Sequence, residues 1–402
     1  MRCLAIALLV ASTLSAQDLA IRGKTILPVS GPAIESGVIL IENGKIKAIG
    51  RASEIAVPDG MTVLEAAVVT PGLIDAHSSA GLSGRLNQPH DQDHQEDGDS
   101  RQAELRALDA YNRHEPLVVW LREHGITTLH TGGGPGGLLA GSSLIVKTRD
   151  APLDDVVLNA EAMMIASLSD AARRSGKESP GTKSKMAAQL RSAFIAARAY
   201  GAELEAAADD ASKTPARDLA KEALLAVLEK RRPLLITAHR DRDIHTALRI
   251  AREFDLNLVI DGASEIYRSL DAVKASGHPV FIHPTMARSS GELENLSMET
   301  AARLEAAEIP FAFQSGYEGY VPKTRVVLFE ASIAVANGLA SDRALARLTL
   351  ESAQLLGIDE RVGSLEVGKD ADLVLFDGDP FEYTSHVTGV VIDGRIASTQ
   401  PR

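Results

Sequence analysis

The sequence predicts an α/β protein built around a (β/α)₈ barrel, with a small β-sandwich domain made from both chain ends. Two observations support this fold class. Short β-branched runs alternate with helical stretches through the middle of the chain, which indicates a parallel sheet, and short strands with tight turns occur near both termini. The number of alternations in 402 residues favours a barrel over an open doubly wound sheet.

The N-terminal segment is typical of an export signal. Arg2 precedes the apolar run at residues 3–10, and small residues follow up to Ala16. The run is too short to span a bilayer, which takes about 20 residues. We therefore expect residues 1–16 to be a signal peptide and the protein to be exported. Cys3, the single cysteine, would leave with it, which excludes disulfides and thiolate chemistry from the mature chain.

Both chain ends predict strands joined by tight turns. The turns are Asn43-Gly44 and Asp393-Gly394, pairs that tolerate the positive φ angles of two-residue hairpins. The strands are expected at residues 19–28, 37–42, 45–49, 371–376 and 387–392. We expect these two ends to meet beside the barrel.

The middle of the chain predicts the barrel elements. Strands are expected at residues 68–75, 127–130, 234–238, 258–261, 280–283 and 311–314. Helices are expected at residues 117–124, 243–253, 266–275, 298–308, 324–337 and 342–353. Residues 160–229 are rich in Ala, Lys, Glu and Arg, and predict a helical insert broken near residues 176–181. The alternative there is one crossover helix with a long connection.

Composition and motifs exclude several functions. Acidic residues number 54 against 42 basic ones, and this net charge of −12 without a basic tract argues against nucleic-acid binding. No GxGxxG or GK[ST] pattern follows a strand, and no GxSxG elbow is present. No stretch after the N-terminal segment is apolar and long enough to span a membrane. A small-molecule substrate or ligand remains the expected partner.

Four motifs, in order, resemble one known family. Residues 69–77 (VTPGLIDAH) resemble the opening signature of the amidohydrolase superfamily, and residues 363–375 (GSLEVGKDADLVL) resemble its closing signature. Residues 43–46 and 391–394 look like the matching hairpins of its composite β-domain. The stretches at 102–112 and 238–244 look like the imidazolonepropionase-like secreted branch.

This resemblance implies a domain division and an activity. It implies a composite β-domain at residues 17–70 and 354–402, and a TIM-like barrel at 71–353 with the helical insert at about 160–230. It also implies metal-dependent hydrolysis of a non-peptide C–N bond, in a cyclic amide or an amino-acid derivative. One divalent metal, zinc in this family, would be the cofactor.

Most of the family's metal ligands are replaced by other residues in this sequence. His77 matches the first imidazole of the family's His-x-His pair, but Ser79 stands where the second belongs. Thr237 stands at the fifth-strand ligand and Asp261 at the sixth-strand histidine. Gly316 replaces the last-strand aspartate, which also serves as the base, although Glu318 is near.

The remaining candidates lead to two alternatives. Lys147 is a candidate for the fourth-strand ligand by its strand context alone. A rebuilt metal site would use His77, His239 and Asp261, with His283 as a further candidate ligand and with Glu265, Asp261 or His239 as the base. The other alternative is a catalytically inactive barrel, without metal, that binds a small molecule or a partner protein. A structural or envelope-associated role is a third possibility that no pattern supports.

Most of these side chains also have ordinary interpretations. His283 is expected to be a satisfied core or loop histidine, and Glu265 an exposed carboxylate. His239 and Arg240 precede Asp243, which fits a polar cluster at a helix N-terminus. His90 and His94 have a metal-like spacing of four, but no helix is predicted there, so we expect a solvated loop.

Overall fold

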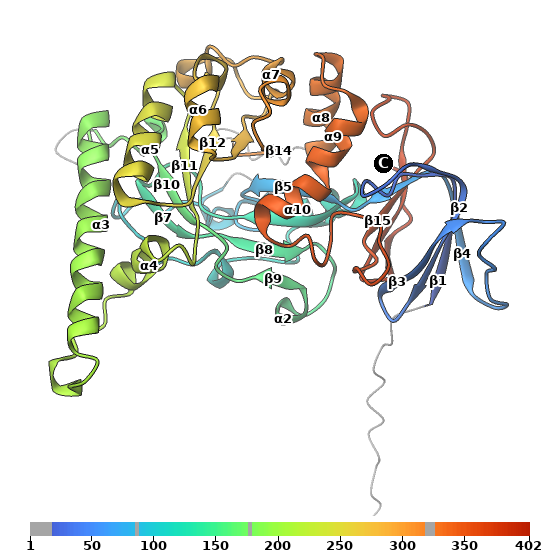
Figure 1. Ribbon diagram of the computed structural model, residues 1–402, viewed down its shortest axis with the longest axis horizontal. Coiled ribbons are helices and arrows are strands. Elements are labelled where there is room, and N and C mark those ends of the chain that lie inside the picture. The colour runs from blue at the N-terminus through green and yellow to red at the C-terminus, as the bar shows by residue number, and fades with distance from the viewer. Residues whose placement is uncertain (1–17, 85–87, 176–178, 318–325) are drawn as a thin grey trace, which may run out of the picture.

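The computed structural model describes residues 18–84, 88–175, 179–317 and 326–402. The expected signal peptide, Cys3 and Glu318 lie outside these residues. The chain has a mixed α/β fold, as predicted, with a sheet of both chain ends lying beside the helices and strands of the middle region (Figure 1).

The end sheet has seven strands in the order β17-β16-β15-β4-β1-β2-β3. The strands are β1 (Leu19–Ile26), β2 (Ile34–Glu42), β3 (Lys45–Arg51), β4 (Thr62–Pro71), β15 (Leu373–Phe376), β16 (Val387–Ile392) and β17 (Arg395–Ser398). Antiparallel pairing of β15 with β4 joins the two halves. Both predicted hairpin turns are confirmed, with φ of 52° and 80° at Asn43 and Gly44, and 50° and 68° at Asp393 and Gly394. The division into domains at residues 70 and 354 stays a prediction.

The strands of the middle region form two sheets. One has the order β5-β6-β8-β9: β5 (Leu73–Ser78), β6 (Ile126–Thr131), β8 (Leu144–Lys147) and β9 (Val157–Asn159). The other has the order β14-β13-β12-β11-β10-β7: β14 (Phe311–Phe313), β13 (Val280–Ile282), β12 (Leu258–Gly262), β11 (Leu234–Ala238), β10 (Met164–Ser167) and β7 (Leu139–Ser142). Strands β10 to β14 are parallel.

The two sheets touch at both edges. Ser78 of β5 forms an isolated parallel bridge with Gly316, just after β14. At the other edge, Ser143 exchanges backbone hydrogen bonds with Ala162 and Met163 at 2.8 and 2.9 Å. The described residues do not form one continuous ring of strands, so the closed eight-stranded barrel stays a prediction.

Ten α-helices are described. They are α1 (Pro116–Glu123), α2 (Leu153–Val156), α3 (Lys183–Ala206), α4 (Leu219–Leu228), α5 (Asp241–Phe254), α6 (Leu270–Ser276), α7 (Thr300–Ala306), α8 (Val327–Ala336), α9 (Ser341–Leu348) and α10 (Leu350–Leu356). None of the helices within the described ranges is long and apolar enough to cross a membrane.

Four expected elements differ in detail. The expected strand at 68–75 is two strands, because the chain passes at Gly72 from the end sheet to β5. Residues 164–167 of the expected helical insert are strand β10, a fully buried run that pairs with β11. The helix expected at 342–353 is divided at Thr349 into α9 and α10, and the one at 266–275 is a 3₁₀ turn followed by α6.

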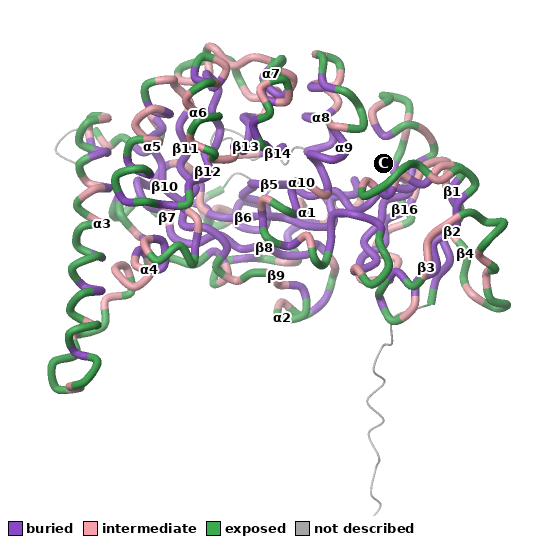
Figure 2. Tube along the Cα trace, viewed as in Figure 1, coloured by how far each residue is buried: buried purple, intermediate pink, exposed green. Residues whose placement is uncertain are grey.

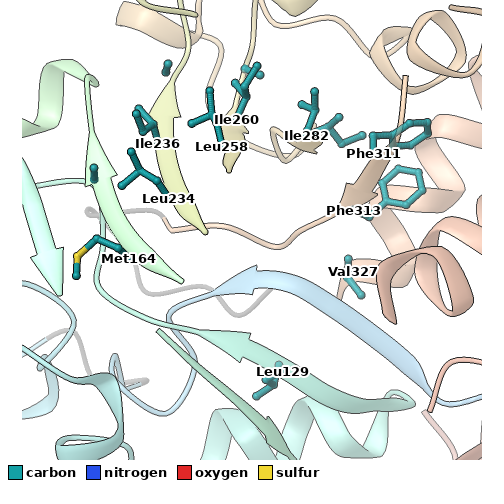
Figure 3. Close-up of a cluster of buried hydrophobic side chains, with 14 of the residues drawn as sticks. Leu129, Met164, Leu234, Ile236, Leu258, Ile260, Ile282, Phe311, Phe313 and Val327 are labelled. Atoms are coloured by element: carbon teal, nitrogen blue, oxygen red, sulfur yellow. The ribbon is translucent and has the colours of Figure 1, made fainter. Parts of the chain in front are cut away.

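Successive side chains along the parallel strands point to opposite faces, and this separates two apolar layers. Ile236, Ile260 and Phe313 belong to the large cluster that packs against the helices (Figure 3). The intervening Leu235, Val259, Phe281 and Ala312 form a second cluster with Ile74 and Ile145 of the other sheet. These strands are buried throughout, whereas much of α3 is exposed (Figure 2).

Candidate functional site

Polar side chains gather where the parallel strands end. Thr237, Asp261 and Gln314 continue the inner alternating set of β11, β12 and β14, so all three reach the same end of the molecule. His77, at the end of β5, joins them. We call these four residues the strand-end cluster. Each is at least nine-tenths buried, and active sites of parallel α/β folds lie at this end of the strands.

Asp261 is the centre of the strand-end cluster. Its Oδ1 contacts His77 Nδ1 at 3.0 Å and accepts a hydrogen bond from Gln314 Nε2 at 2.7 Å. Its Oδ2 accepts a hydrogen bond from the Thr237 hydroxyl at 2.7 Å. Gln314 also donates to the Phe281 carbonyl oxygen at 2.9 Å, which fixes its orientation. Both carboxylate oxygens are therefore held by protein groups.

The pKa shifts indicate that His77 and Asp261 form an ion pair. Burial alone would lower the pKa of His77, but the Asp261 carboxylate outweighs it and the pKa lies above the ordinary 6.5. Burial would raise the pKa of Asp261, but the charge and hydrogen bond of His77 hold it below 3.8. A buried imidazolium and a buried carboxylate thus neutralise each other.

Two further polar pairs lie beside His77, and sequence reasoning missed both. Asp75 accepts hydrogen bonds from the Ser315 backbone N–H at 3.0 Å and hydroxyl at 2.5 Å, while burial raises its pKa to about 7. His130 contacts the Ala76 carbonyl oxygen at 2.5 Å and the Ser143 hydroxyl at 2.6 Å, and burial lowers its pKa to about 3. Asp75 lies within the 69–77 motif, and its place in that motif is the signal that could have identified it as a site residue.

Two of the positions where expected ligands are replaced, Ser79 and Gly316, hold small residues with structural contacts. The Ser79 hydroxyl lies 3.0 Å from that of Ser83, within the loop that follows β5. Gly316 has φ of +66° and donates its backbone N–H to the His77 carbonyl oxygen at 3.0 Å. A Cβ at this position would lie 2.8 Å from Pro284 Cγ, so an aspartate here would be strained.

Two of the candidate bases, Glu265 and His239, already make hydrogen bonds to other protein groups. Glu265 accepts hydrogen bonds from the Asp241 backbone N–H at 2.9 Å and from Asn295 Nδ2 at 2.6 Å, so it stabilises the start of α5. It is buried, not exposed as expected. His239 Nδ1 contacts the Ser264 hydroxyl at 2.9 Å, and burial lowers its pKa. His283 is buried against Thr300, 3.2 Å from its hydroxyl, and does not join the strand-end cluster.

Lys147 lies at the opposite end from the strand-end cluster. Because β8 runs antiparallel to β6, its last residue is placed at the start of β6. There Lys147 Nζ contacts Asp370 Oδ2 at 2.7 Å, Asp372 Oδ2 at 3.0 Å and Asp393 Oδ1 at 2.5 Å. We call these four residues the lysine cluster. It joins the middle region to the end sheet, so Lys147 is not placed to act as a metal ligand at the strand ends.

The paired histidines of the acidic loop are also separated. His90 is exposed, whereas His94 is buried, stacks on Tyr317 with ring centroids 4.3 Å apart, and has its pKa lowered by burial to about 4. The expectation of a solvated loop is therefore wrong for His94.

The donor set of the strand-end cluster does not fit the family's metal. Catalytic zinc needs about three protein ligands and an open position for water. Ser79, Thr237 and Gly316 offer neither an imidazole nor a carboxylate, and Asp261 has both oxygens bound to protein donors. Within the described residues, no group of three or more His, Cys, Asp or Glu side chains is arranged to hold a metal ion.

Sequence comparison places the chain near known amidohydrolases. A model described as "Amidohydrolase family" matches residues 319–397. The amidohydrolase tasK of Hapsidospora irregularis is 23% identical over 408 residues, which cover 91% of this chain and 40% of that protein. A 5'-deoxyadenosine deaminase of Methanobrevibacter smithii is 40% identical over 55 residues, which cover 14% of this chain and 13% of that protein. The matched segments span less than half the length of both relatives.

Structural comparison agrees over nearly the whole chain. An amidohydrolase from Thermotoga maritima has a TM-score of 0.89 and 28% sequence identity, covering 95% of this chain and 100% of that one. An adenosine deaminase from Xanthomonas campestris, solved with bound zinc, has a TM-score of 0.54 at 16% identity, covering 94% and 92%. Such a distant likeness shows the fold alone. The family match and the Thermotoga maritima structure together support the predicted amidohydrolase superfamily, whereas the imidazolonepropionase-like branch stays a prediction.

Proposed function

We propose that this chain is an amidohydrolase-fold protein that binds a small polar molecule at its strand ends without hydrolysing it by the family's metal-dependent route. The observation that carries this proposal is the full occupation of Asp261 by His77, Thr237 and Gln314. The positive charge that a metal would supply to a buried carboxylate comes instead from the imidazolium of His77.

The chemistry of the surrounding residues suggests the class of ligand. The strand-end cluster includes the amide of Gln314, and the hydroxyl groups of Ser79, Ser264 and Ser315 follow its members within three residues along the chain. Neutral donors and acceptors of this kind recognise polar, uncharged groups. The proposed ligand is therefore a cyclic amide or a neutral amino-acid derivative, held in a TIM-like barrel that the structural neighbours also suggest.

The second candidate is hydrolysis of a non-peptide C–N bond. The names of the relatives, which include amidohydrolases and deaminases, favour it. It requires His239 to exchange Ser264 for a metal or for substrate, and Glu265 to release the start of α5 before acting as a base. These rearrangements make it the less supported candidate.

A substrate screen with two readouts separates the candidates. The full chain, prepared with Zn²⁺, Mn²⁺ or Fe²⁺ in the medium, would be mixed with cyclic amides and N-acyl amino acids. Binding would be followed by thermal shift and product by mass spectrometry. We expect at least one compound to raise the melting temperature, to be recovered intact, and to lose its effect in Thr237→Val. Metal-dependent product formation that Asp261→Asn abolishes would overturn the proposal.

The proposal includes export, on the evidence of residues 1–17 alone. The positive start, the short apolar run and the small residues before Gln17 support cleavage and release. Expression of the full chain in a Gram-negative host, followed by fractionation and N-terminal sequencing, tests this. A mature N-terminus near Gln17 in the periplasm is expected, whereas an intact N-terminus in the cytoplasm would contradict it.

A further inference from the structure

An acidic cavity lies between the loops that follow β5 and β6, and it shares no residue with the strand-end cluster. Its volume is about 330 Å³, and most of its lining comes from residues 93–110 and 133–140. Such a volume lies at the lower end of the range for small-molecule sites. Among the described lining residues, five carry carboxylates and one, Arg106, carries a guanidinium. The carboxylates are those of Asp93, Glu96, Asp99, Glu104 and Asp109.

The cavity has more negative charge than the cations around it neutralise. Arg106 Nε lies 3.7 Å from Asp109 Oδ2 and 3.7 Å from Glu161 Oε1, so two carboxylates already share its charge. The other four lining carboxylates form no ion pair with any described residue. Arg174 lies outside the lining and contacts Asp97 at 3.9 Å, which is not a lining residue either. The excess charge therefore favours a cationic ligand.

His94 provides an independent indication of a ligand. It lines the cavity and is more than nine-tenths buried, yet its Nδ1 has no hydrogen-bond partner among the described residues. Its carbonyl oxygen accepts a hydrogen bond from the Gly134 N–H at 2.7 Å, and its ring stacks on Tyr317. These contacts fix the ring and leave Nδ1 unused. Because buried polar atoms nearly always have a partner, an unpartnered one in a cavity wall points to a missing donor or acceptor.

The protonation state of His94 decides which kind of partner is missing. Burial lowers the pKa of His94 to about 4, although the charges of Asp93 and Asp97 act in the opposite direction. At neutral pH the imidazole is therefore uncharged, and one of its ring nitrogens is an acceptor. The cavity thus offers an acceptor in its buried wall and carboxylates on exposed residues such as Glu104. An ammonium group, with three donors and no acceptor, matches this set.

The rest of the lining favours an organic cation over a metal ion. Leu82, Ala107 and Leu139 are buried lining residues, so part of the cavity wall is apolar. Over the part of the chain that the structure describes, no three or more His, Cys, Asp or Glu side chains converge as metal ligands would. The apolar wall instead suits a short alkyl chain attached to the ammonium group.

We propose that this cavity binds a small aliphatic amine, whose ammonium group contacts His94 and the lining carboxylates while its alkyl chain lies on the apolar wall. Because the cavity and the strand-end cluster have no residue in common, this site is a second one. The proposal does not depend on which ligand, if any, binds at the strand ends.

Calorimetric titration of the full chain with cadaverine, an aliphatic diamine, tests the proposal near neutral pH. Pentanediol, its uncharged analogue, is the matched probe. We expect saturable binding of cadaverine, no binding of pentanediol, and no displacement of cadaverine by Ca²⁺ at equal ionic strength. Absence of cadaverine binding, equal binding of pentanediol, or displacement by Ca²⁺ would overturn the proposal.

Two variants connect the binding to this cavity. His94→Phe keeps a ring against Tyr317 but removes the acceptor, and should weaken cadaverine binding by about tenfold. Asp93→Asn/Glu104→Gln changes two exposed side chains that form no ion pair with described residues, so it should leave the fold intact. It should weaken binding by about fivefold, as expected for exposed charges.

Asp154→Asn is the matched control for the loss of charge. Asp154 is an exposed residue of α2, does not line the cavity and forms no ion pair within the described ranges. Its substitution should change the affinity by less than about twofold, because distant charges are screened. Circular dichroism would establish that each variant is folded, and if His94→Phe is not, the double variant decides. An affinity that the double variant changes no more than Asp154→Asn does would overturn the proposal.

Discussion

The strand-end cluster and the lysine cluster are both buried, charged groups, but they differ in how their charge is balanced. In the strand-end cluster one imidazole faces one carboxylate, and neutral Thr237 and Gln314 complete the contacts. In the lysine cluster one ammonium group faces three carboxylates. The first is balanced within itself, whereas the second also draws on cations around it, because Asp370 pairs with Lys45 and Arg361 and Asp393 pairs with Arg149. A buried charge therefore indicates a functional site only when it also lies at the end of the strands where active sites occur.

The largest expected effect is the loss of Lys147. Lys147→Met would leave Asp370, Asp372 and Asp393 without their shared cation, and we expect the free energy of unfolding to fall by about 3–5 kcal/mol. Urea denaturation followed by circular dichroism would measure it. Lys47→Met is the control, because Lys47 forms an exposed pair with Glu42 at 3.6 Å and should cost less than about 1 kcal/mol. Equal costs for both variants would show that the lysine cluster does not hold the two regions together.

The next effect concerns Asp261. Asp261→Asn removes the charge that stabilises the His77 imidazolium, but His77 can release its proton, so the loss should be smaller, about 2–3 kcal/mol. The same urea denaturation applies. The loss should not change when a chelator is added to the wild type and the variant. A chelator that destabilises the wild type to the level of Asp261→Asn would show that a metal had been lost.

Gly316 tests how the backbone beside the strand-end cluster contributes to stability. Gly316→Ala combines a φ of +66° with a Cβ only 2.8 Å from Pro284 Cγ, so we expect a loss of about 2 kcal/mol. Gly277→Ala is the matched control, with φ of +69° and open space around the new Cβ, and should cost about 1 kcal/mol. If the two variants unfold at the same urea concentration, the contact with Pro284 contributes nothing.

The last test concerns the pH dependence of the lysine cluster. Burial raises the pKa of Asp372 to about 6 from 3.8 in the unfolded chain, against the pull of Lys147 and with repulsion from Asp393. The folded protein therefore holds a proton that the unfolded chain has released, so this contribution to stability is complete below pH 3.8 and is lost as the pH rises through about 6.

The Asp372→Asn variant lacks the titrating carboxyl group, so comparing it with the wild type isolates the contribution of Asp372 to the pH dependence of stability. The wild type should lose stability relative to Asp372→Asn between about pH 4 and pH 6, and the difference should then stay constant. Unfolding free energies from urea titrations at half-unit pH steps would show the slope. A difference that is flat across this range, or that grows in favour of the wild type, would contradict the assignment.

Much of the fold was predictable because its strands and turns are determined by residues that lie close together in the sequence. Asn43-Gly44 and Asp393-Gly394 fix their hairpins by their own backbone preferences, and strand alternation places Thr237 and Asp261 on one face. Residues 164–167 were misassigned because their burial depends on pairing with β11, which the surrounding Ala-rich composition does not reveal.

The site was less predictable because it depends on contacts distant in sequence. The position of Lys147 depends on the direction of β8, and a short apolar run does not encode the direction of a strand. His94 packs against Tyr317, more than 200 residues later in the sequence, which no local pattern reveals. Gln314 could not be recognised without knowing that Asp261 lies 2.7 Å away.

The measurement that tests the central claim most directly is metal content. The protein, expressed with Zn²⁺, Mn²⁺ and Fe²⁺ in the medium, would be analysed by mass spectrometry beside a His77→Ala control. We predict far less than one metal per chain in a well-folded wild type, with no difference from the control. About one metal per chain, lost in His77→Ala, would contradict the claim that His77 and Asp261 neutralise each other without a metal.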